Sequence, residues 1–234
     1  MREKNMSENE ERFMTAMGDA WFERNHARKE LDIPMGCKLF EKAMQHRLVR
    51  MGPESKILEI GCSSGYNLTY LCEKYQLQGY GIDPSGEAVA YGNEKIQREE
   101  SKINLRQGTA DKLPFEDQIF SVVILGFCMY CIERKYVSCV ISEIDRVLKV
   151  GGMVAIWDFD TPFPYRRANI HHENLWTYKY DMAKLLSGNP QYTLIEKRSF
   201  SDEEEGFVPD IQERCALNIL YKEQMKDVYR ENSI

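Results

Sequence analysis

A glycine-bearing turn is the first segment of the chain whose residue types and spacing suit the binding of a ligand. Residues 57–60 are apolar apart from Glu59, and the next five residues read G-C-S-S-G from Gly61 to Gly65. Gly61 allows the chain to turn sharply, and Gly65 allows a following helix to begin close to a ligand. The first amides of such a helix have no partners within it, so they suit an anionic group such as a carboxylate. This segment therefore predicts a ligand site between a strand and a helix.

The glycine spacing disfavours a dinucleotide at this turn. A turn that binds a pyrophosphate usually reads G-x-G-x-x-G. Here Ser63 replaces the middle glycine, and the third glycine is missing. A nicotinamide oxidoreductase or epimerase is therefore the weaker interpretation, and a turn without a ligand is the other alternative.

A carboxylate follows the second apolar segment of the chain. Residues 79–82 predict a strand that ends at Asp83 and Pro84. A carboxylate at the tip of a strand can accept both hydrogen bonds from a ribose diol. Nicotinamide enzymes use the same device, so Asp83 indicates a nucleoside without saying which one.

Two further motifs complete the series. Residues 108–115 read G-T-A-D-K-L-P-F, and residues 146–152 read R-V-L-K-V-G-G. Together with the first turn and Asp83, and in the same order, these segments resemble the class I S-adenosylmethionine-dependent methyltransferase family, in particular its type 11-like members. The resemblance covers residues 56–160, and an expected terminal hairpin extends it to about residue 222.

Two residues depart from the family pattern. Thr109 stands where many members have Asp, which moves the acid that contacts adenine to Asp111. Ser121 replaces the usual Asp of an F-D-V-V segment, and we expect this change to affect the sheet rather than the chemistry.

The resemblance implies a site for S-adenosylmethionine, with S-adenosylhomocysteine as the product and no metal. Glu59 would orient the first turn or reach the amino acid part of the cofactor. Asp83 would hold the ribose, with Pro84 against the adenine. The residues of the turn from Gly61 to Gly65 would wrap the methionyl part. Ala110 and Asp111 would contact the adenine edge, and Gly126 and Phe127 would border the sulfonium. The full set of implied cofactor residues is Glu59, Gly61, Cys62, Ser63, Gly65, Asp83, Pro84, Ala110, Asp111, Gly126 and Phe127.

The elements that position these residues alternate between strand and helix. This alternation predicts a Rossmann-like, doubly wound α/β fold with a seven-stranded sheet, mostly parallel. Two final strands without a helix between them predict an antiparallel C-terminal hairpin, and N-terminal helices precede the sheet. We expect strands at residues 56–60, 79–82, 103–107, 120–126, 153–159, 192–200 and 212–222, and helices at 10–17, 35–50, 66–74, 86–97 and 135–148, with a turn at Gly151–Gly152.

The chain divides into two parts on this interpretation. Residues 1–52 form a helical extension or lid, in which Trp21, Arg24 and Asn25 could fold over the cofactor. Residues 53–234 form the cofactor-binding domain, with an acceptor-side insertion at about residues 160–190.

The candidate catalytic residues are His171, His172 and Tyr130. If the acceptor is a hydroxyl, a base must take its proton, and histidine is the usual choice. The two histidines lie after the fifth strand, beyond whose carboxyl end ligands bind in open α/β sheets. By the resemblance, Tyr130 stands where the family faces the reacting methyl group. Solvated histidines and a packed tyrosine are the alternatives.

The acceptor is the open part of the interpretation. The N-terminal and 171–181 segments also resemble a bacterial branch that is associated with surface-glycan biosynthesis, so a small polar acceptor, in particular a sugar or glycan hydroxyl, is the first hypothesis. The alternatives are N-methylation of a tRNA or a small amine, and a non-catalytic protein that binds the cofactor to regulate a partner. The sequence does not indicate an oligomeric state.

Composition limits the partners. A net charge of −6 disfavours nucleic acid, which usually requires a basic face. Seven cysteines, an odd number, indicate reduced thiols rather than disulfides. Cys128 and Cys131 lack the second pair of ligands that zinc needs, so burial is the better interpretation.

The apolar stretch at 120–132 is shorter than the roughly 20 residues of a membrane-spanning helix. We therefore expect a cytoplasmic protein with no membrane insertion.

Overall fold

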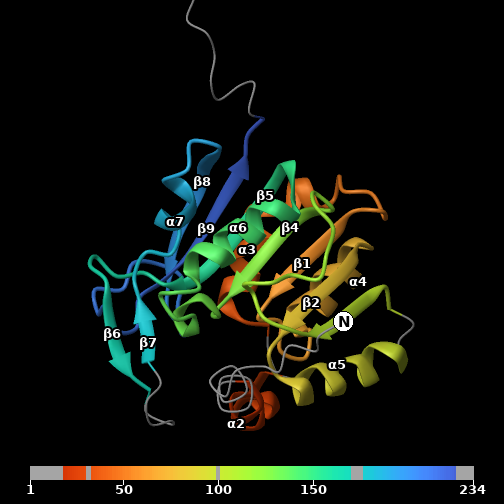
Figure 1. Ribbon diagram of the computed structural model, residues 1–234, viewed down its shortest axis with the longest axis horizontal. Helices are drawn as coiled ribbons and strands as arrows, with labels where there is room; N and C mark the ends of the chain where they lie inside the picture. The colour runs from red at the N-terminus through yellow and green to blue at the C-terminus, as the bar shows by residue number, and fades with distance from the viewer. Residues whose placement is uncertain (1–17, 30–32, 99–100, 170–175, 225–234) are drawn as a thin grey trace, which may run out of the picture.

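A seven-stranded sheet forms the centre of the molecule (Figure 1). The computed structural model describes residues 18–29, 33–98, 101–169 and 176–224. The strand order is β3-β2-β1-β4-β5-β9-β8, in which the first five strands are parallel and β9 is antiparallel to both of its neighbours. The predicted doubly wound sheet with an antiparallel C-terminal hairpin is thereby confirmed. The strands are β1 (Lys56–Ile60), β2 (Gln78–Asp83), β3 (Ile103–Gln107), β4 (Phe120–Gly126), β5 (Leu148–Phe159), β8 (Tyr192–Phe200) and β9 (Cys215–Lys222).

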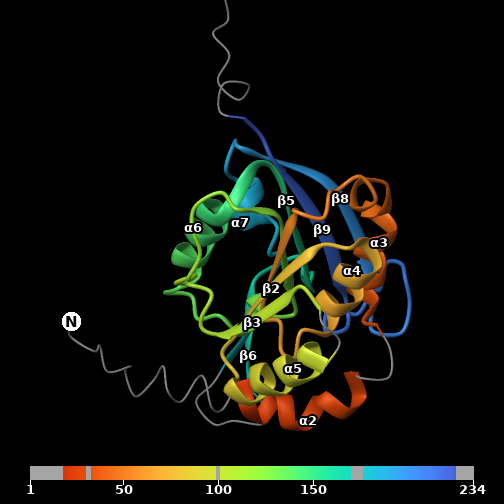
Figure 2. The ribbon, with the colours of Figure 1, turned by 90° about the vertical axis from the view of Figure 1, so that its right-hand side faces the viewer.

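Helices cover both faces of this sheet (Figure 2). Successive side chains of a strand point to opposite faces, so Ile57 packs with one helical layer and Leu58 with the other. Because both layers exclude water, β4 is apolar almost throughout, as a central parallel strand should be. One layer contains α3 (Met35–Leu48), α4 (Tyr66–Tyr75) and α5 (Gly86–Arg98), and the other contains α6 (Val137–Val147) and α7 (Lys184–Ser187).

The N-terminal helix α3 belongs to the core. Phe40 is fully buried, and its ring lies 6.1 Å from that of Trp157 on β5. The indole of Trp157 fills the space beside two glycines, since a Cβ on either Gly36 or Gly126 would collide with it. The other described N-terminal helix, α2 (Ala20–Lys29), lies beside α5 instead (Figure 2).

The structure differs from the sequence prediction at the start of the fifth strand. Gly151 and Gly152 were predicted to form a turn before the fifth strand, which is wrong: β5 already begins at Leu148 and includes both glycines. The pairing of β4 with β5 is irregular here, and Gly151 takes a positive φ of +80°, so the glycines accommodate a bulge rather than a turn. The insertion at about 160–190 contains a short antiparallel ribbon, β6 (Tyr165–Ala168) and β7 (Trp176–Lys179), and then α7.

The remaining boundaries agree within a few residues. The helix predicted at 10–17 lies outside the described residues. Among the described helices, none is long and apolar enough to cross a membrane.

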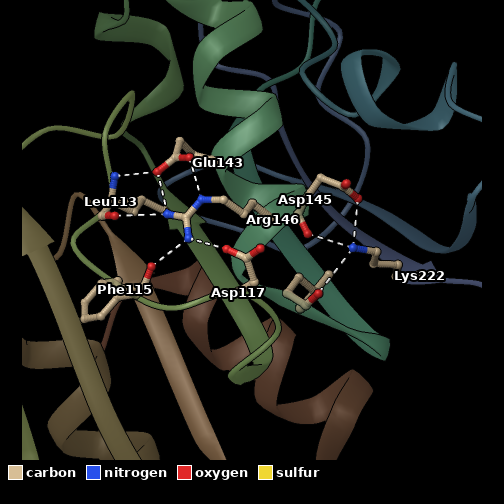
Figure 3. A network of polar contacts seen from close by, with 8 residues as sticks. Leu113, Phe115, Asp117, Glu143, Asp145, Arg146 and Lys222 are labelled. Carbon is tan, nitrogen blue, oxygen red and sulfur yellow. Dashed lines mark hydrogen bonds and ion pairs between the residues drawn. The ribbon is translucent and has the colours of Figure 1, made fainter.

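Arg146 ties α6 to the loop that precedes β4 (Figure 3). Its guanidinium makes two 2.7 Å hydrogen bonds to the carboxylate of Glu143 and donates to the carbonyl oxygens of Leu113 and Phe115 at 3.0 and 2.6 Å. It also pairs with Asp117 at 2.9 Å. The two motifs at 108–115 and 146–152 are therefore bonded to each other.

Replacing Arg146 by Met should destabilise the protein by roughly 2–3 kcal/mol, because it leaves Glu143 and two carbonyl oxygens without their charged donor. Arg198→Met is the matched control. Arg198 has nearly the same side-chain exposure, 28% against 29%, but among the described residues it forms ion pairs only with two glutamates at the surface. We expect the control to cost about 1 kcal/mol or less. Urea unfolding of both variants measures the difference, and equal losses would contradict the role given to Arg146.

Candidate functional site

The turn between β1 and α4 follows the expected conformation. Gly61 has a φ of +74° and Gly65 a φ of +76°, in the region that favours glycine. The amides of Gly61 and Cys62 both donate to the carbonyl oxygen of Ile82, at 2.8 and 3.1 Å. A Cβ on Gly61 would also collide with the Cβ of Cys128. The turn is therefore held against the end of β2 and against the loop after β4.

Asp83 links three loops at the carboxyl edge of the sheet. One carboxylate oxygen accepts a hydrogen bond from the amide of Ser63 at 2.6 Å, and the other accepts from Ser85 at 2.9 Å. The carbonyl oxygen of Asp83 accepts from Gly108 at 3.0 Å. The residue is only 8% exposed. A carboxylate has about four acceptor positions, so one such group can accept several hydrogen bonds at once.

Glu59 is the next-to-last residue of β1 and precedes the first turn. It is 1% exposed, and its Oε1 accepts a hydrogen bond of 2.7 Å from the side-chain amide of Asn67 in the first turn of α4. The Oδ1 atom of Asn67 is buried and has no hydrogen-bond partner within the described part of the chain. This pair fixes α4 relative to β1.

The cysteines around the turn are neutral thiols. Burial raises the pKa of Cys62 and of Cys128 well above 9, and nearby carboxylates raise both further. Burial also raises the pKa of Cys131 to about 12. These thiols stay protonated at neutral pH, so they are poor nucleophiles and poor metal ligands. No group of three or more His, Cys, Asp or Glu that could hold a metal occurs among the residues that the structure describes.

The loop after β3 reaches the same edge. Gly108 is bonded to Asp83, and the next residues pass toward α6, where the amide of Leu113 donates to Glu143 at 2.7 Å. Ala110 packs against the α6 side of the core, and Asp111 is partly exposed. The structure thus brings Ala110 and Asp111 onto a loop that is anchored to Asp83.

Aromatic side chains surround the loop after β4. Phe127 has a φ of +50°, and its amide donates to the carbonyl oxygen of Trp157 at 2.9 Å. The ring of Phe159, at the end of β5, contacts the rings of Phe127 and Tyr130, with centroids 5.9 and 5.4 Å apart. Burial raises the pKa of Tyr130 well above 10. The Tyr130 hydroxyl is therefore protonated at neutral pH and acts as a hydrogen-bond donor rather than a base.

Asp158 is a buried acid that the sequence interpretation missed. It is 2% exposed, and its two oxygens accept hydrogen bonds from the amides of Phe159 at 2.8 Å and Tyr130 at 3.2 Å. It therefore joins the end of β5 to the short helix η2 (Met129–Cys131) after β4. Burial raises the pKa of Asp158 to about 7, although these hydrogen bonds and the charge of Lys179 oppose the shift. An acid at the end of an apolar strand was the signal available in the sequence.

Asp19 is a second residue that was missed. Its Oδ1 atom accepts hydrogen bonds from the hydroxyl of Ser85 at 2.6 Å and the amide of Glu87 at 3.2 Å. The Ser85 hydroxyl in turn accepts from the amide of Ala88, so both residues cap the start of α5. A Cβ on Gly18 would lie 2.8 Å from the amide nitrogen of Ser85. The N-terminal segment therefore rests directly on the loop that follows Asp83.

The residues predicted to form a lid come directly after Gly18 and Asp19 in the sequence. Phe22 of α2 is 7% exposed, and its ring packs against that of Tyr91 on α5, with centroids 5.6 Å apart. Trp21 and Asn25 are half-buried, with the Asn25 amide bonded to the Trp21 carbonyl oxygen at 2.8 Å, and Arg24 is exposed. The structure brings α2 beside the site, and its action as a lid stays a prediction.

The β6–β7 ribbon follows β5 and lies beyond the carboxyl end of that strand (Figure 1). Lys179 at its end is 6% exposed, and its Nζ lies 3.5 Å from the ring centroid of Phe159 and donates to the carbonyl oxygen of Gln212 at 3.0 Å. The candidate bases His171 and His172 fall in the segment between β6 and β7, outside the described residues.

The raised pKa of Asp158 should appear in the pH dependence of stability. In the unfolded chain its pKa returns to about 3.8, so the folded state binds more protons between that value and about pH 7. The stability of the wild type relative to Asp158→Asn should then fall by roughly 2–3 kcal/mol between about pH 5 and pH 8. Urea unfolding across this range measures it, with the exposed-loop variant Asp202→Asn as a control for lost charge. A difference that does not change with pH would contradict the assignment.

The motifs on these loops lie within a region that matches a known protein family. Residues 57–152 match the model of a family described as a methyltransferase domain. A demethylmenaquinone methyltransferase from Mycobacterium marinum is 28% identical over 161 residues, which are 68% of this chain and 65% of that protein. One from Bacillus cereus is 32% identical over 119 residues, which are 50% of this chain and 49% of that protein. The chain thus spans less than two thirds of the length of these relatives.

Solved structures share the fold over most of the chain. The 1,6-didemethyltoxoflavin-N1-methyltransferase of Burkholderia thailandensis, with 1,6-didemethyltoxoflavin and S-adenosylhomocysteine bound, has a TM-score of 0.69, 13% identity and coverage of 96% of this chain and 94% of its own. The geranyl diphosphate C-methyltransferase of Streptomyces coelicolor has a TM-score of 0.62, 13% identity and coverage of 80% and 78%. Residues 57–152 of this chain are therefore similar to the methyltransferase domain family, and the solved methyltransferases share its fold.

Proposed function

We propose that this chain transfers the methyl group of S-adenosylmethionine to a small molecule that binds at the carboxyl edge of the sheet. The observation that carries the proposal is the position of Asp83, whose carboxylate joins the turn after β1 to the loop after β2. This edge, where the strand order reverses between β1 and β4, is where open α/β sheets bind ligands.

The residues at this edge fit the adenosyl and methionyl parts of the cofactor. Asp83 offers a fixed acceptor pair for a ribose diol, and Pro84 follows it at the adenine side. The start of α4 has no side-chain cap, so its first amides suit the cofactor's carboxylate. When bound, the cofactor supplies an activated methyl group. The residues proposed to hold it are Glu59, Gly61, Cys62, Ser63, Gly65, Asp83, Pro84, Ala110, Asp111, Gly126 and Phe127.

The acceptor that we favour is a flat ring bearing a hydroxyl or another acidic position. Phe127, Tyr130 and Phe159 form an edge-to-face cluster beside the loop after β4, and such rings stack well with flat molecules. The named relatives act on demethylmenaquinone, 1,6-didemethyltoxoflavin and geranyl diphosphate. We therefore place a quinol-like ring ahead of the sugar hydroxyl that the sequence first indicated.

The chain's own contribution to the reaction is alignment and proton removal. Holding two reactants in line can lower a barrier by roughly 7–11 kcal/mol. A protonated Tyr130 can orient an acceptor oxygen, and His171 or His172 would take its proton. Asp158 would keep the Tyr130 backbone in place through its hydrogen bond.

Asp83→Asn should weaken the affinity for S-adenosylmethionine by roughly 10-fold to 100-fold, because a charged acceptor for the ribose is lost. Isothermal titration calorimetry with S-adenosylmethionine and S-adenosylhomocysteine measures this. Asp202→Asn, the same chemical change in an exposed loop, should bind as the wild type does. If the wild type gives no heat with either compound but is saturated by NAD, the proposed function is wrong.

His171→Ala and His172→Ala should separate binding from turnover. If either histidine is the base, that variant should lose about 100-fold or more in turnover while its affinity for the cofactor is kept. Methyl transfer to hydroquinones, sugars, small amines and tRNA is measured with S-adenosylhomocysteine release as the readout. Full activity in both variants would remove the histidines from the mechanism. Cofactor binding without transfer to any acceptor would indicate a non-catalytic binding protein.

A further inference from the structure

A cavity of about 330 Å³ lies at the amino edge of the sheet, opposite the candidate functional site. It is formed where the end of α3 and the turn after it meet the first residues of β4 and the bulged start of β5. None of its lining residues belongs to the cofactor site. The lining residues are Arg47, Arg50, Met51, Ser121, Gly151 and Met153.

Two arginines give this cavity a positive charge. Arg47 is half-buried, and its guanidinium lies over the ring of Tyr221 at 5.5 Å from the centroid. Arg50 is exposed at the rim. Within the part of the chain that the structure describes, neither arginine forms an ion pair with a carboxylate. Two guanidinium groups without an acidic partner are suited to an oxyanion that carries more than one charge.

Ser121 keeps the cavity cationic. It lines the wall from the start of β4, at the position where the resemblance described above has Asp. An aspartate here would place a carboxylate in the same wall as both arginines and offset their charge. The serine hydroxyl instead adds a donor that an oxyanion can use. The departure from the family pattern therefore has its effect at this cavity rather than at the cofactor site.

The rest of the wall is apolar. Met51 and Met153 line it, and the aromatic ring of Tyr221 lies under Arg47. Methionine side chains adapt to varied ligand shapes. The volume is at the lower end of the range for small-molecule sites. The occupant should therefore combine an anionic group with an apolar body of modest size.

We propose that this cavity binds a small organic phosphate, with the phosphoryl group between Arg47, Arg50 and Ser121 and the organic part against the methionines. This site is separate from methyl transfer, because it lies at the opposite edge of the sheet. The proposal therefore does not depend on the function proposed above.

Phenyl phosphate is a suitable probe, titrated by calorimetry into the full chain at low ionic strength. The wild type should show saturable binding that is tighter than for inorganic phosphate. Arg50→Gln should weaken it by roughly 10-fold or more, because one charged donor is removed. Lys102→Gln removes one positive charge from an exposed residue just before β3, and it should leave the affinity unchanged.

Ser121→Asp and Ser121→Asn form the decisive pair, since the two side chains have nearly the same shape and differ in charge. We expect Ser121→Asp to abolish binding and Ser121→Asn to retain most of it. The circular dichroism spectra and the free energies of urea unfolding of both variants should equal those of the wild type, which shows that they fold. The proposal fails if the wild type shows no saturable binding, or if Ser121→Asp binds as tightly as Ser121→Asn. A short RNA that binds more tightly than phenyl phosphate with the same dependence on Arg50 would overturn the small-molecule assignment.

Discussion

The carboxylate of Asp83 is the interaction on which the site depends. The turn after β1 and the loop after β2 each leave backbone amides at the edge of the sheet, and Asp83 accepts one from each. Asp19 then extends the same set of hydrogen bonds to the N-terminal segment through Ser85. A single buried acid thus joins the two loops that meet at the switch point, and the segment that precedes α2 rests on the second of them.

Three buried acids lie near this edge, and hydrogen bonds of two kinds compensate for their burial. Burying a carboxylate is costly unless hydrogen bonds replace the lost water. Asp83 and Asp158 both accept backbone amides, whereas Glu59 accepts from the side chain of Asn67. For Asp158, burial raises the pKa to about 7. The same bonds that offset the burial also fix the loops, so loop geometry and carboxylate ionisation are coupled.

The sequence predicted the sheet well because its signals are local. Apolar segments bounded by glycine, proline or acids mark β1 to β4, and the residues on the loops follow from strand ends. The misassigned and missed features depend on distant contacts. Two adjacent glycines such as Gly151 and Gly152 are typical of a turn, and only the pairing of β5 with β4 shows that they belong to a strand. Asp19 accepts a hydrogen bond from the first turn of α5, which is distant in the sequence. The positions of Asp158 and Trp157 likewise depend on the loop after β4 and on α3.

The direction of the strand–helix units explains why Asp83 and Arg47 lie at opposite edges of the sheet. Parallel strands end at one edge, where α4 and α5 begin, and the amides of a helix start favour carboxylates. Asp83 and Asp19 lie at that edge. Helices end at the other edge, where their carbonyl groups favour cations, and Arg47 lies in the last turn of α3. The acidic cofactor site and the basic cavity therefore follow from the same chain polarity. Ser121 matters because a carboxylate at that position would oppose this arrangement.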